Sequence, residues 1–260
     1  MIRLYGSAPY RILVLHGGPG AVGSLKGFAR ELALRSGGGI AEPLQTAYSV
    51  AGQINELFRQ TEYLSAEPLT LIGHSWGVWL AALFAQKYPA RIQKIIGIGS
   101  PPLKECYVQS IAERRAAKLS ETEWALLEKI TEADDQNTEK LTALLARTDN
   151  YAPQNAHLHN ADRADMQMMS LVWAEAAQMR REGKILSCFQ SLSCGLAFIF
   201  GKEDPHPAQG VALPLQETKV PFKMNLLDHC GHSPFMEYYA REEFYTRLLS
   251  ELSLKTESGL

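Results

Sequence analysis

The sequence predicts an α/β fold in which helices cover a doubly wound, mostly parallel sheet. Short apolar runs typical of buried strands alternate with stretches of helical spacing in the first part of the chain and again near its end. Between these two parts lies a block without strand-like runs. A helical block between strands of one sheet predicts a cap over the carboxyl edge of the strands, where open α/β sheets bind their ligands.

The composition is that of an ordinary soluble globular protein. The chain has 260 residues, of which 46% are hydrophobic and 21% are charged, so it can bury the core of one large domain. Its net charge of −2 at pH 7 gives no reason to expect nucleic acid or a membrane as a partner. We therefore expect a small-molecule or short-peptide substrate, and the sequence does not indicate the oligomeric state.

The sequence also predicts a cytosolic location. The apolar run near the N-terminus is short and ends in a glycine turn, unlike a signal peptide, and no run reaches the roughly 18 apolar residues of a membrane span. The cysteines show no metal-site spacing, and in a chain without an export signal we expect reduced, buried thiols. The four are Cys106, Cys188, Cys194 and Cys230.

The elements before the helical block alternate regularly between strands and helices. The apolar run at 11–15 is a predicted strand that enters a Gly-Pro-Gly loop, and Pro89 ends a predicted helix rich in alanine and leucine. The predicted strands are 11–15, a short one within 37–45, 69–72 and 92–98, and the predicted helices are 25–34, 49–64 and 76–88.

The helical block is predicted to be an insertion into the sheet domain. From residue 103 to 186 no segment has the pattern of a strand, and Ser120 with Glu123 forms a capping box that begins a helix. Strands are predicted again at 195–201 and 221–227, followed by a helix at 240–252. We therefore expect an α/β core from residues 1–102 and 187–260, and a helical cap or lid from residues 103–186.

A serine between two glycines lies at the junction of the 69–72 strand and the following helix. In the stretch Gly73-His74-Ser75-Trp76-Gly77 the chain turns from strand to helix within one residue. The residue at the apex is forced toward positive φ, so its side chain projects clear of the sheet. Glycines two positions before and after it avoid collisions in so tight a turn. The pattern predicts a nucleophile at Ser75, with an ordinary glycine turn as the alternative.

A nucleophilic serine needs a base at the same edge of the sheet. His229 and His232 both lie just past the last predicted strand. His232 is favoured because Gly231 lets the backbone bend and because it stands farther from the strand end. His206 follows another predicted strand and could line the site.

The base is usually oriented by a carboxylate, which should also follow a strand. Glu203 and Asp204 come directly after the 195–201 strand. Asp204, which precedes Pro205, better suits a loop that points inward, and a solvated turn charge is the alternative. The predicted chain order is Ser75, Asp204, His232.

A tetrahedral intermediate needs two N–H donors aimed at its oxyanion. The backbone N–H of Trp76 begins the helix after Ser75, where the helix dipole assists it. The glycine-rich loop after the first strand can supply the second donor through the N–H of Gly18, because a substrate can approach such a backbone closely. A plain Gly-Pro turn is the alternative for this loop.

Four motifs together resemble those of a known superfamily. They are His-Gly-Gly-Pro-Gly at 16–20, Gly-His-Ser-Trp-Gly at 73–77, Gly-Lys-Glu-Asp at 201–204 and Cys-Gly-His-Ser-Pro-Phe at 230–235. They resemble the α/β-hydrolase superfamily over essentially the whole chain, and the first two look most like the proline iminopeptidase branch. The resemblance implies a triad of Ser75, Asp204 and His232, and an oxyanion hole from the N–H groups of Gly18 and Trp76.

The resemblance also suggests substrate contacts in the cap. Cap carboxylates of those peptidases bind the free amino group of the substrate, often beside tryptophans. Trp173 and Glu175 lie in a loosely similar place, and an exposed helix charge is the alternative for Glu175. Two features depart from the branch, because residues 37–49 lack an Asp-Gln-Arg-Gly-type run and the N-terminal β-hairpin is cut short. Proline-specific peptidase activity is therefore left open.

These observations predict a serine hydrolase that cleaves a small ester or amide through an acyl-enzyme, esterase-like or proline-iminopeptidase-like, without cofactor or metal. Two other classes stay open. A metal hydrolase is suggested by His157, His159 and Asp162, although their spacing is one residue longer than in the His-x-His-x-Asp run and they fall in a helical block. The scaffold could also serve as a non-catalytic ligand-binding or receptor module.

Overall fold

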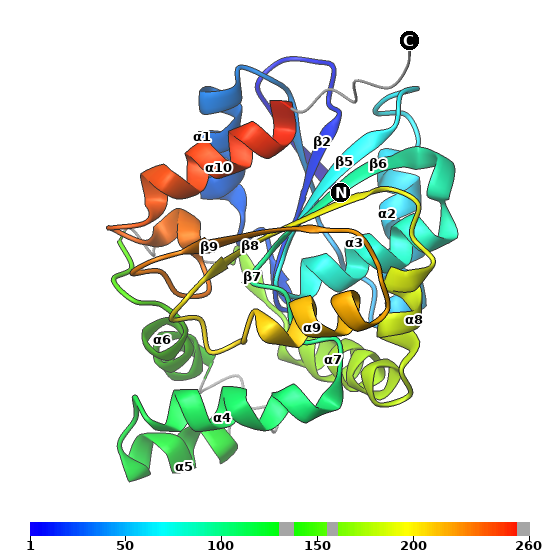
Figure 1. Ribbon diagram of the computed structural model, residues 1–260. Coiled ribbons are helices and arrows are strands. Elements are labelled where there is room, and N and C mark those ends of the chain that lie inside the picture. The colour runs from blue at the N-terminus through cyan, green and yellow to red at the C-terminus, as the bar shows by residue number, and fades with distance from the viewer. Residues whose placement is uncertain (130–137, 155–160, 254–260) are drawn as a thin grey trace.

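The computed structural model describes residues 1–129, 138–154 and 161–253 (Figure 1). Its centre is a seven-stranded sheet in the order β1-β4-β2-β5-β6-β8-β9. Each neighbouring pair is parallel except β1 and β4, which run antiparallel. The predicted doubly wound, mostly parallel sheet is therefore confirmed. The strands are β1 Ile2–Tyr5, β2 Ile12–Leu15, β4 Ile40–Pro43, β5 Leu69–His74, β6 Ile92–Ile98, β8 Gly195–Gly201 and β9 Lys223–Leu227.

Helices cover both faces of the sheet because successive strand residues point to opposite sides. In β2, Leu13 and Leu15 belong to one apolar cluster and Val14 belongs to another. Figure 1 shows α1 and α10 together on one side of the sheet, away from α3, α8 and α9. Helices α1 Lys26–Ser36 and α10 Arg241–Ser253 pack with Val14, whereas α2 Val50–Thr61, α3 Trp76–Lys87, α8 Lys184–Gln190 and α9 Gln209–Glu217 pack with Leu13.

Strand β1 is an element that the sequence pattern did not reveal. It pairs antiparallel with β4 at the edge of the sheet, with Ile2 opposite Pro43. Its four residues are half-buried or exposed, so they form no continuous apolar run. A single strand precedes β2 in the described chain.

The chain between β6 and β8 is mainly helical. Ser120 N–H donates to Glu123 Oε2 at 2.9 Å and Glu123 N–H donates to Ser120 Oγ at 3.3 Å, so the predicted capping box begins α5. The described helices of this segment are α4 Val108–Ala116, α5 Glu121–Lys129, α6 Thr138–Asp149 and α7 Met166–Arg181. Helix α8 crosses the predicted boundary at 186–187 and packs onto the core through Ile185 and Cys188.

The expectation that residues 103–186 contain no strand is wrong at one place. Strand β7, Arg163–Ala164, pairs antiparallel with β3, Ala21–Val22, which follows the glycine-rich loop after β2. Two residues are too few to produce a hydrophobic pattern, and their pairing depends on a distant part of the chain. The two-stranded sheet β3–β7 therefore fastens the insertion to the carboxyl end of β2.

The structure also bears on the absence of a predicted membrane span. None of the helices in the described ranges is both long and apolar enough to cross a membrane.

Candidate active site

Ser75 occupies a strained turn between β5 and α3. Its backbone has φ 50° and ψ −120°, and its N–H donates to the carbonyl of Ile98 at 2.9 Å. A Cβ on Gly73 would collide with the backbone of Gly77, and a Cβ on Gly77 would collide with the carbonyl of Leu15. Both flanking positions therefore require glycine, and the turn holds the serine at the carboxyl end of the central strand.

Asp204 and His232 are brought together from two different strands. Asp204 follows β8, His232 follows β9, and His232 Nδ1 lies 2.9 Å from Asp204 Oδ2. Both side chains are buried. The two alternatives point elsewhere, because His229 is exposed with its ring 5.4 Å from that of Tyr151, and Glu203 accepts the N–H of Cys230. The structure thus joins the favoured acid to the favoured base.

The loop of residues 229–237, called here the His232 loop, lies against the serine turn. The carbonyl oxygen of His232 is 3.1 Å from His74 Nε2, and the centroids of the two imidazoles are 4.9 Å apart. Among the described residues, the hydrogen bonds of His232 involve Asp204, His74 and Asp149, and none involves Ser75 Oγ. Contacts between nucleophile and base are often long without substrate and shorten in the reactive complex.

The negative charge of Asp204 and the positive charge of protonated His232 stabilise each other. Burial acts to raise the pKa of the Asp204 carboxyl, but the charge of His232 and hydrogen bonds from His206 and His232 hold that pKa well below its usual range. Burial acts to lower the pKa of His232, and the charge of Asp204 outweighs it and raises the pKa. Burial and repulsion by His232 lower the pKa of His74 to about 3, so His74 is neutral near neutral pH.

His206 shares Asp204 with His232. Its Nδ1 lies 3.1 Å from Asp204 Oδ1, and its backbone N–H donates to the same oxygen at 2.8 Å. The rings of His206 and His232 are stacked, with centroids 4.3 Å apart. Burial and the charge of His232 lower the pKa of His206. A neutral second imidazole therefore holds the oxygen of Asp204 that His232 does not use.

Asp204, His206 and His232 also form the one group, within the part of the chain that the structure describes, whose ligand atoms could hold a metal ion. These atoms lie within 4.8 Å of one another. Both carboxylate oxygens of Asp204 already accept hydrogen bonds from the imidazoles, which a metal would have to displace. The arrangement suits an oriented, proton-accepting imidazole better than a metal centre.

Residues of the insertion support this pair. The N–H of His232 donates to the carbonyl of Asp149 at 2.7 Å, and the Asp149 carboxylate pairs with Arg115 of α4. Arg114 donates to the carbonyl of Asp204 at 3.0 Å. Helix α4 and the end of α6 therefore hold the backbone of both the acid and the base. These residues carry no signal in the sequence, because contacts between distant segments leave no local pattern.

Glu237 ties the His232 loop to the segment that follows α6. Its fully buried carboxylate accepts the backbone N–H groups of Gly231 at 2.8 Å, Tyr151 at 2.7 Å and Ala152 at 2.6 Å. Three donors to one carboxylate compensate for its removal from water. Glu237 was also not predicted, because it is one of many carboxylates near the C-terminus.

The two predicted oxyanion donors belong to segments that adjoin Ser75. Trp76 is the first residue of α3, and Gly18, with φ 51°, follows β2. A Cβ on Gly17 would be 3.0 Å from Ser75 Cβ, so the glycine-rich loop runs directly beside the serine. Within the described chain, neither N–H donates to another backbone group or side chain. Two unpaired N–H groups beside a projecting serine can stabilise an oxyanion.

The two predicted substrate contacts in the cap have other partners. Trp173 of α7 stacks on Trp79 of α3, with ring centroids 5.6 Å apart and an interplanar angle of 9°. Glu175 Oε2 accepts the N–H of Val50 at 2.8 Å, at the beginning of α2. Both side chains therefore take part in packing the insertion against the core, and Glu175 carries a helix-capping contact that the sequence analysis did not foresee.

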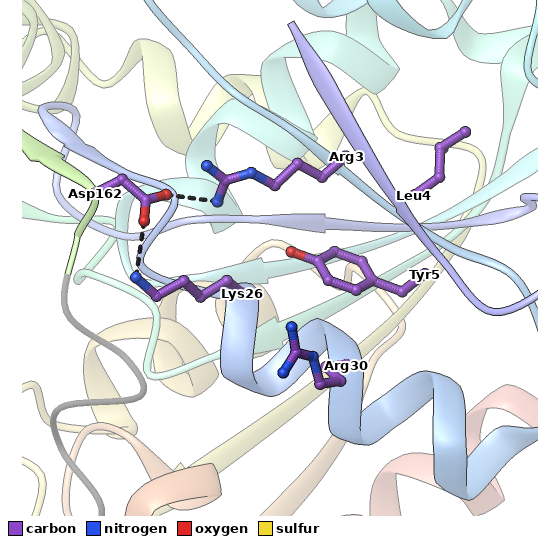
Figure 2. Close-up of a pocket in the computed structure, with 6 residues that line it drawn as sticks. All are labelled: Arg3, Leu4, Tyr5, Lys26, Arg30 and Asp162. Carbon is purple, nitrogen blue, oxygen red and sulfur yellow. Dashed lines mark hydrogen bonds and ion pairs between the residues drawn. The ribbon is translucent and has the colours of Figure 1, made fainter.

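The metal-hydrolase alternative falls partly on residues outside the described ranges, because it includes His157 and His159. Its third member, Asp162, pairs with Arg3 and with Lys26 (Figure 2). These three residues, with Leu4, Tyr5 and Arg30, line a hollow of about 410 Å³. None of them belongs to the group around Ser75, so this hollow is separate from the candidate active site.

The fold is shared with solved structures of low sequence identity. VinJ has a TM-score of 0.68 at 18% identity, covering 96% of this chain and 93% of that chain. A carboxylesterase structure from the thaumarchaeon Nitrososphaera gargenis has a TM-score of 0.63 at 20% identity, with 97% and 93% covered. Proline iminopeptidase from Mycobacterium smegmatis has a TM-score of 0.63 at 15% identity, with 96% and 93% covered. At these identities the likeness shows the fold alone.

Sequence comparison gives the family. No curated protein matches the chain in sequence. A family model for the alpha/beta hydrolase fold matches residues 10–197, well over half of the chain, including Gly18 and Ser75. The sheet order, the strained serine turn and this match agree with one another. The chain belongs to the alpha/beta hydrolase fold family.

Proposed function

We propose that the chain is a serine hydrolase that cleaves a small ester or amide. The observation that carries this proposal is the buried contact of 2.9 Å between His232 Nδ1 and Asp204 Oδ2, at the sheet edge where Ser75 projects. A serine hydroxyl is a weak nucleophile, and it requires a base whose orientation and positive charge are supported by a carboxylate. The stacked His206 and the neutral His74 surround that base.

In the first half of the proposed reaction, His232 Nε2 takes the proton of Ser75 Oγ as the oxygen attacks the substrate carbonyl carbon. The carbonyl π electrons move onto its oxygen, which accepts hydrogen bonds from the N–H groups of Gly18 and Trp76. Asp204 stabilises the imidazolium and takes no proton. When the tetrahedral intermediate collapses, His232 gives its proton to the leaving alcohol or amine, and the acyl group stays on Ser75.

In the second half, water replaces the leaving group. His232 takes a proton from the water as its oxygen attacks the acyl carbon, and the same N–H groups stabilise the second oxyanion. Collapse breaks the bond to Ser75 Oγ, which regains its proton from His232. The acid product leaves, and no cofactor enters the balance.

An ester is the substrate class that we favour over a peptide with a free amine. An aminopeptidase needs a carboxylate available to the substrate amine, and Glu175 is engaged by the N–H of Val50. The solved structures of similar fold include both a carboxylesterase and a proline iminopeptidase, so they do not separate the two activities. Proline-iminopeptidase-like activity is the alternative.

A non-catalytic receptor on the same scaffold is the alternative from another class. A residue with φ 50° that is not glycine costs on the order of 1–3 kcal/mol. Burial of the Asp204 and His232 charges is a further cost. A module that only binds a ligand gains nothing from either feature, whereas a serine hydrolase depends on both.

A fluorophosphonate probe tests the proposal, because only an activated serine reacts with it quickly. We expect labelling of the wild-type chain at Ser75 and its loss in Ser75→Ala. Ser100→Ala is the matched control: this buried serine follows the neighbouring strand β6, but its hydroxyl donates to the carbonyl of Pro101. Labelling of Ser75→Ala at the wild-type rate, or no labelling of the wild type, would contradict a serine mechanism.

A substrate panel then separates the two activities. Acyl p-nitrophenyl esters of increasing length are compared with aminoacyl naphthylamides, including the prolyl one. We expect turnover of short or medium acyl esters, and preferential turnover of the naphthylamides would favour the peptidase.

We also propose a cytosolic location. All four cysteines are free thiols in the structure, as expected for a reducing compartment, but the expectation that all are buried is wrong for Cys106, which is exposed. The proposed partner is the substrate itself, a small molecule or short peptide.

A further inference from the structure

The side chain of Gln53 connects the two predicted halves of the oxyanion hole. Gln53 lies on α2 and is fully buried. Its Oε1 accepts the indole N–H of Trp76 at 3.0 Å, and its Nε2 donates to the carbonyls of Ala47 at 3.1 Å and Pro19 at 3.5 Å. One amide therefore bridges the residue that follows Ser75 and the residue that follows Gly18.

A glutamine in this place is not explained by core packing alone. Glutamine is seldom fully buried, and burial of an amide is tolerated only where its hydrogen bonds are made. An apolar side chain of similar volume would fill the same space, but it would leave the buried indole N–H of Trp76 without its partner. The hydrogen bonds of Gln53 therefore call for a role of their own.

The carbonyl of Pro19 marks the orientation of the central peptide in the glycine-rich turn. The carbonyl of Gly18 accepts the N–H of Ala21 at 2.8 Å, so residues 18–21 form a turn with Pro19 and Gly20 at its centre. A type II turn, which Pro-Gly sequences favour, requires positive φ at the third residue. Gly20 is not among the described glycines with positive φ. The central peptide therefore departs from the type II orientation, and its oxygen points to Gln53 Nε2.

We propose that Gln53 is a positioning residue of the oxyanion hole, and this inference rests on the serine hydrolase function proposed above. It holds the turn through Pro19 and the start of α3 through the Trp76 indole, so that the N–H groups of Gly18 and Trp76 converge on one oxygen. Such donors stabilise the transition state because they are already aligned and need no reorganisation. The next peptide of the turn is held separately, because the N–H of Asp165 donates to the carbonyl of Gly20 at 2.9 Å.

The first test uses Gln53→Met, which keeps a side chain of similar length and removes all three hydrogen bonds. The measurements are the rate of fluorophosphonate labelling at Ser75, and kcat and KM on the best ester of the panel. We expect labelling and kcat to fall about tenfold to 100-fold, less than for loss of a whole oxyanion donor, with KM within about twofold. A purely structural role would not lower kcat selectively.

Gln60→Met is the matched control. Gln60 lies on the same helix, and its amide also donates to a backbone carbonyl, that of Leu44 at 2.8 Å. We expect this variant to label at the wild-type rate. If Gln53→Met labels as fast as Gln60→Met, Gln53 only fills the core and the inference is overturned while the proposed function stands. If the wild type does not label at Ser75, the proposed function itself fails.

The second test is Trp76→Phe, which removes the indole N–H that donates to Gln53 Oε1 and leaves Gln53 in place. We expect labelling to slow about three- to tenfold, as for loss of one hydrogen bond. Thermal unfolding shows which variants fold. In folded proteins the double variant is expected to be no slower than Gln53→Met alone, because both changes remove one shared contact. Trp76→Phe labelling at the wild-type rate overturns the inference even if Gln53→Met does not fold.

Discussion

The two halves of the candidate active site are held in place by different means. On the side of Ser75, backbone sterics fix the geometry, because Gly73 and Gly77 leave no room for a Cβ. On the side of Asp204 and His232, buried charges and hydrogen bonds with the insertion fix it, including those that Glu237 of the His232 loop accepts from Tyr151 and Ala152. The position of Ser75 therefore depends on close backbone packing of its turn against β2, and the position of His232 depends on charges and hydrogen bonds gathered from distant segments.

A single added methyl group should be enough to disrupt the serine turn. In Gly77→Ala the new Cβ would collide with the carbonyl of Leu15, so we expect a loss of about 2–3 kcal/mol in the free energy of unfolding. Displacement of Ser75 should lower kcat about 100-fold. Denaturant unfolding and ester turnover measure the two effects.

The control for this change is Gly195→Ala in β8, where a Cβ would make only ordinary contacts, 3.6 Å from Lys94 Cγ. Gly77 itself lies in helix α3, where alanine is normally favoured over glycine, so a loss of stability in Gly77→Ala would have to come from the collision. A Gly77→Ala protein as stable and active as wild type would therefore remove the steric account of the serine turn.

The charged half should fail more gradually. In Glu237→Gln an amide N–H₂ would face one of the three backbone N–H groups that the carboxylate now accepts. We expect a loss of about 2–3 kcal/mol in stability and a decrease of about tenfold in kcat, because the His232 loop is no longer held. Glu251→Gln is the control: Glu251 is a buried carboxylate paired with Lys94, away from the site. It should lose stability and keep kcat, and equal loss of kcat in both variants would argue against a specific role for Glu237.

The pH dependence should show that His206 acts through Asp204. His232 must be neutral to serve as a base, so kcat/KM is expected to rise with pH through its pKa. Asp204 raises that pKa, and the hydrogen bond from His206 withdraws part of the carboxylate charge from His232. His206→Phe keeps a ring and loses the donor, so the pKa of His232 should rise further and the acid limb of kcat/KM should move to higher pH.

His206→Asn keeps a donor near the Nδ1 position and should leave the limb close to that of the wild type. The other groups that face His232, namely Asp149, Arg115 and the neutral His74, are the same in both variants. An acid limb that stays in place in His206→Phe would show that the charge of Asp204 is not shared in this way.

The smallest effect on activity is expected for a change at Glu175, because its contact with Val50 belongs to neither half of the site. Its contact with the N–H of Val50 places a negative charge at the beginning of α2, worth about 0.3–1 kcal/mol. Glu175→Gln should change kcat/KM for both neutral esters and aminoacyl substrates by less than about twofold. A loss of about 10-fold or more in kcat/KM for the aminoacyl substrate alone is the size expected for a desolvated ion pair. That result would instead favour peptidase activity.

This contrast also explains what the sequence could predict. The serine turn is local, since strand, apex, glycines and helix follow one another within residues 69–87, and their pattern is readable without knowledge of the fold. The sheet was predictable for the same reason, because apolar runs separated by helical spacing mark the buried strands β2, β5, β6 and β8. Strand β1 was not, because its half-buried residues resemble a loop.

The side chains that support the site were less accessible to sequence reasoning. Asp204 and His232 could be proposed because each follows a strand, but Arg115, Asp149 and Glu237 carry no such signal. Their role exists only once the insertion meets the His232 loop. Gln53 is similar, since one glutamine in an amphipathic helix has no local mark of the two carbonyls and the indole that it contacts.

The pairing of β3 with β7 sets an order for the appearance of activity during protein synthesis. The contacts of the serine turn are complete once Ile98 has been made, but the turn around Gly20 waits for Asp165, and the proposed base arrives only with His232. If the proposed function holds, a chain that ends before Asp165 has neither His232 nor a fastened glycine-rich loop beside Ser75, and its serine should stay inert. Hydrolysis would then report that the last part of the chain has folded.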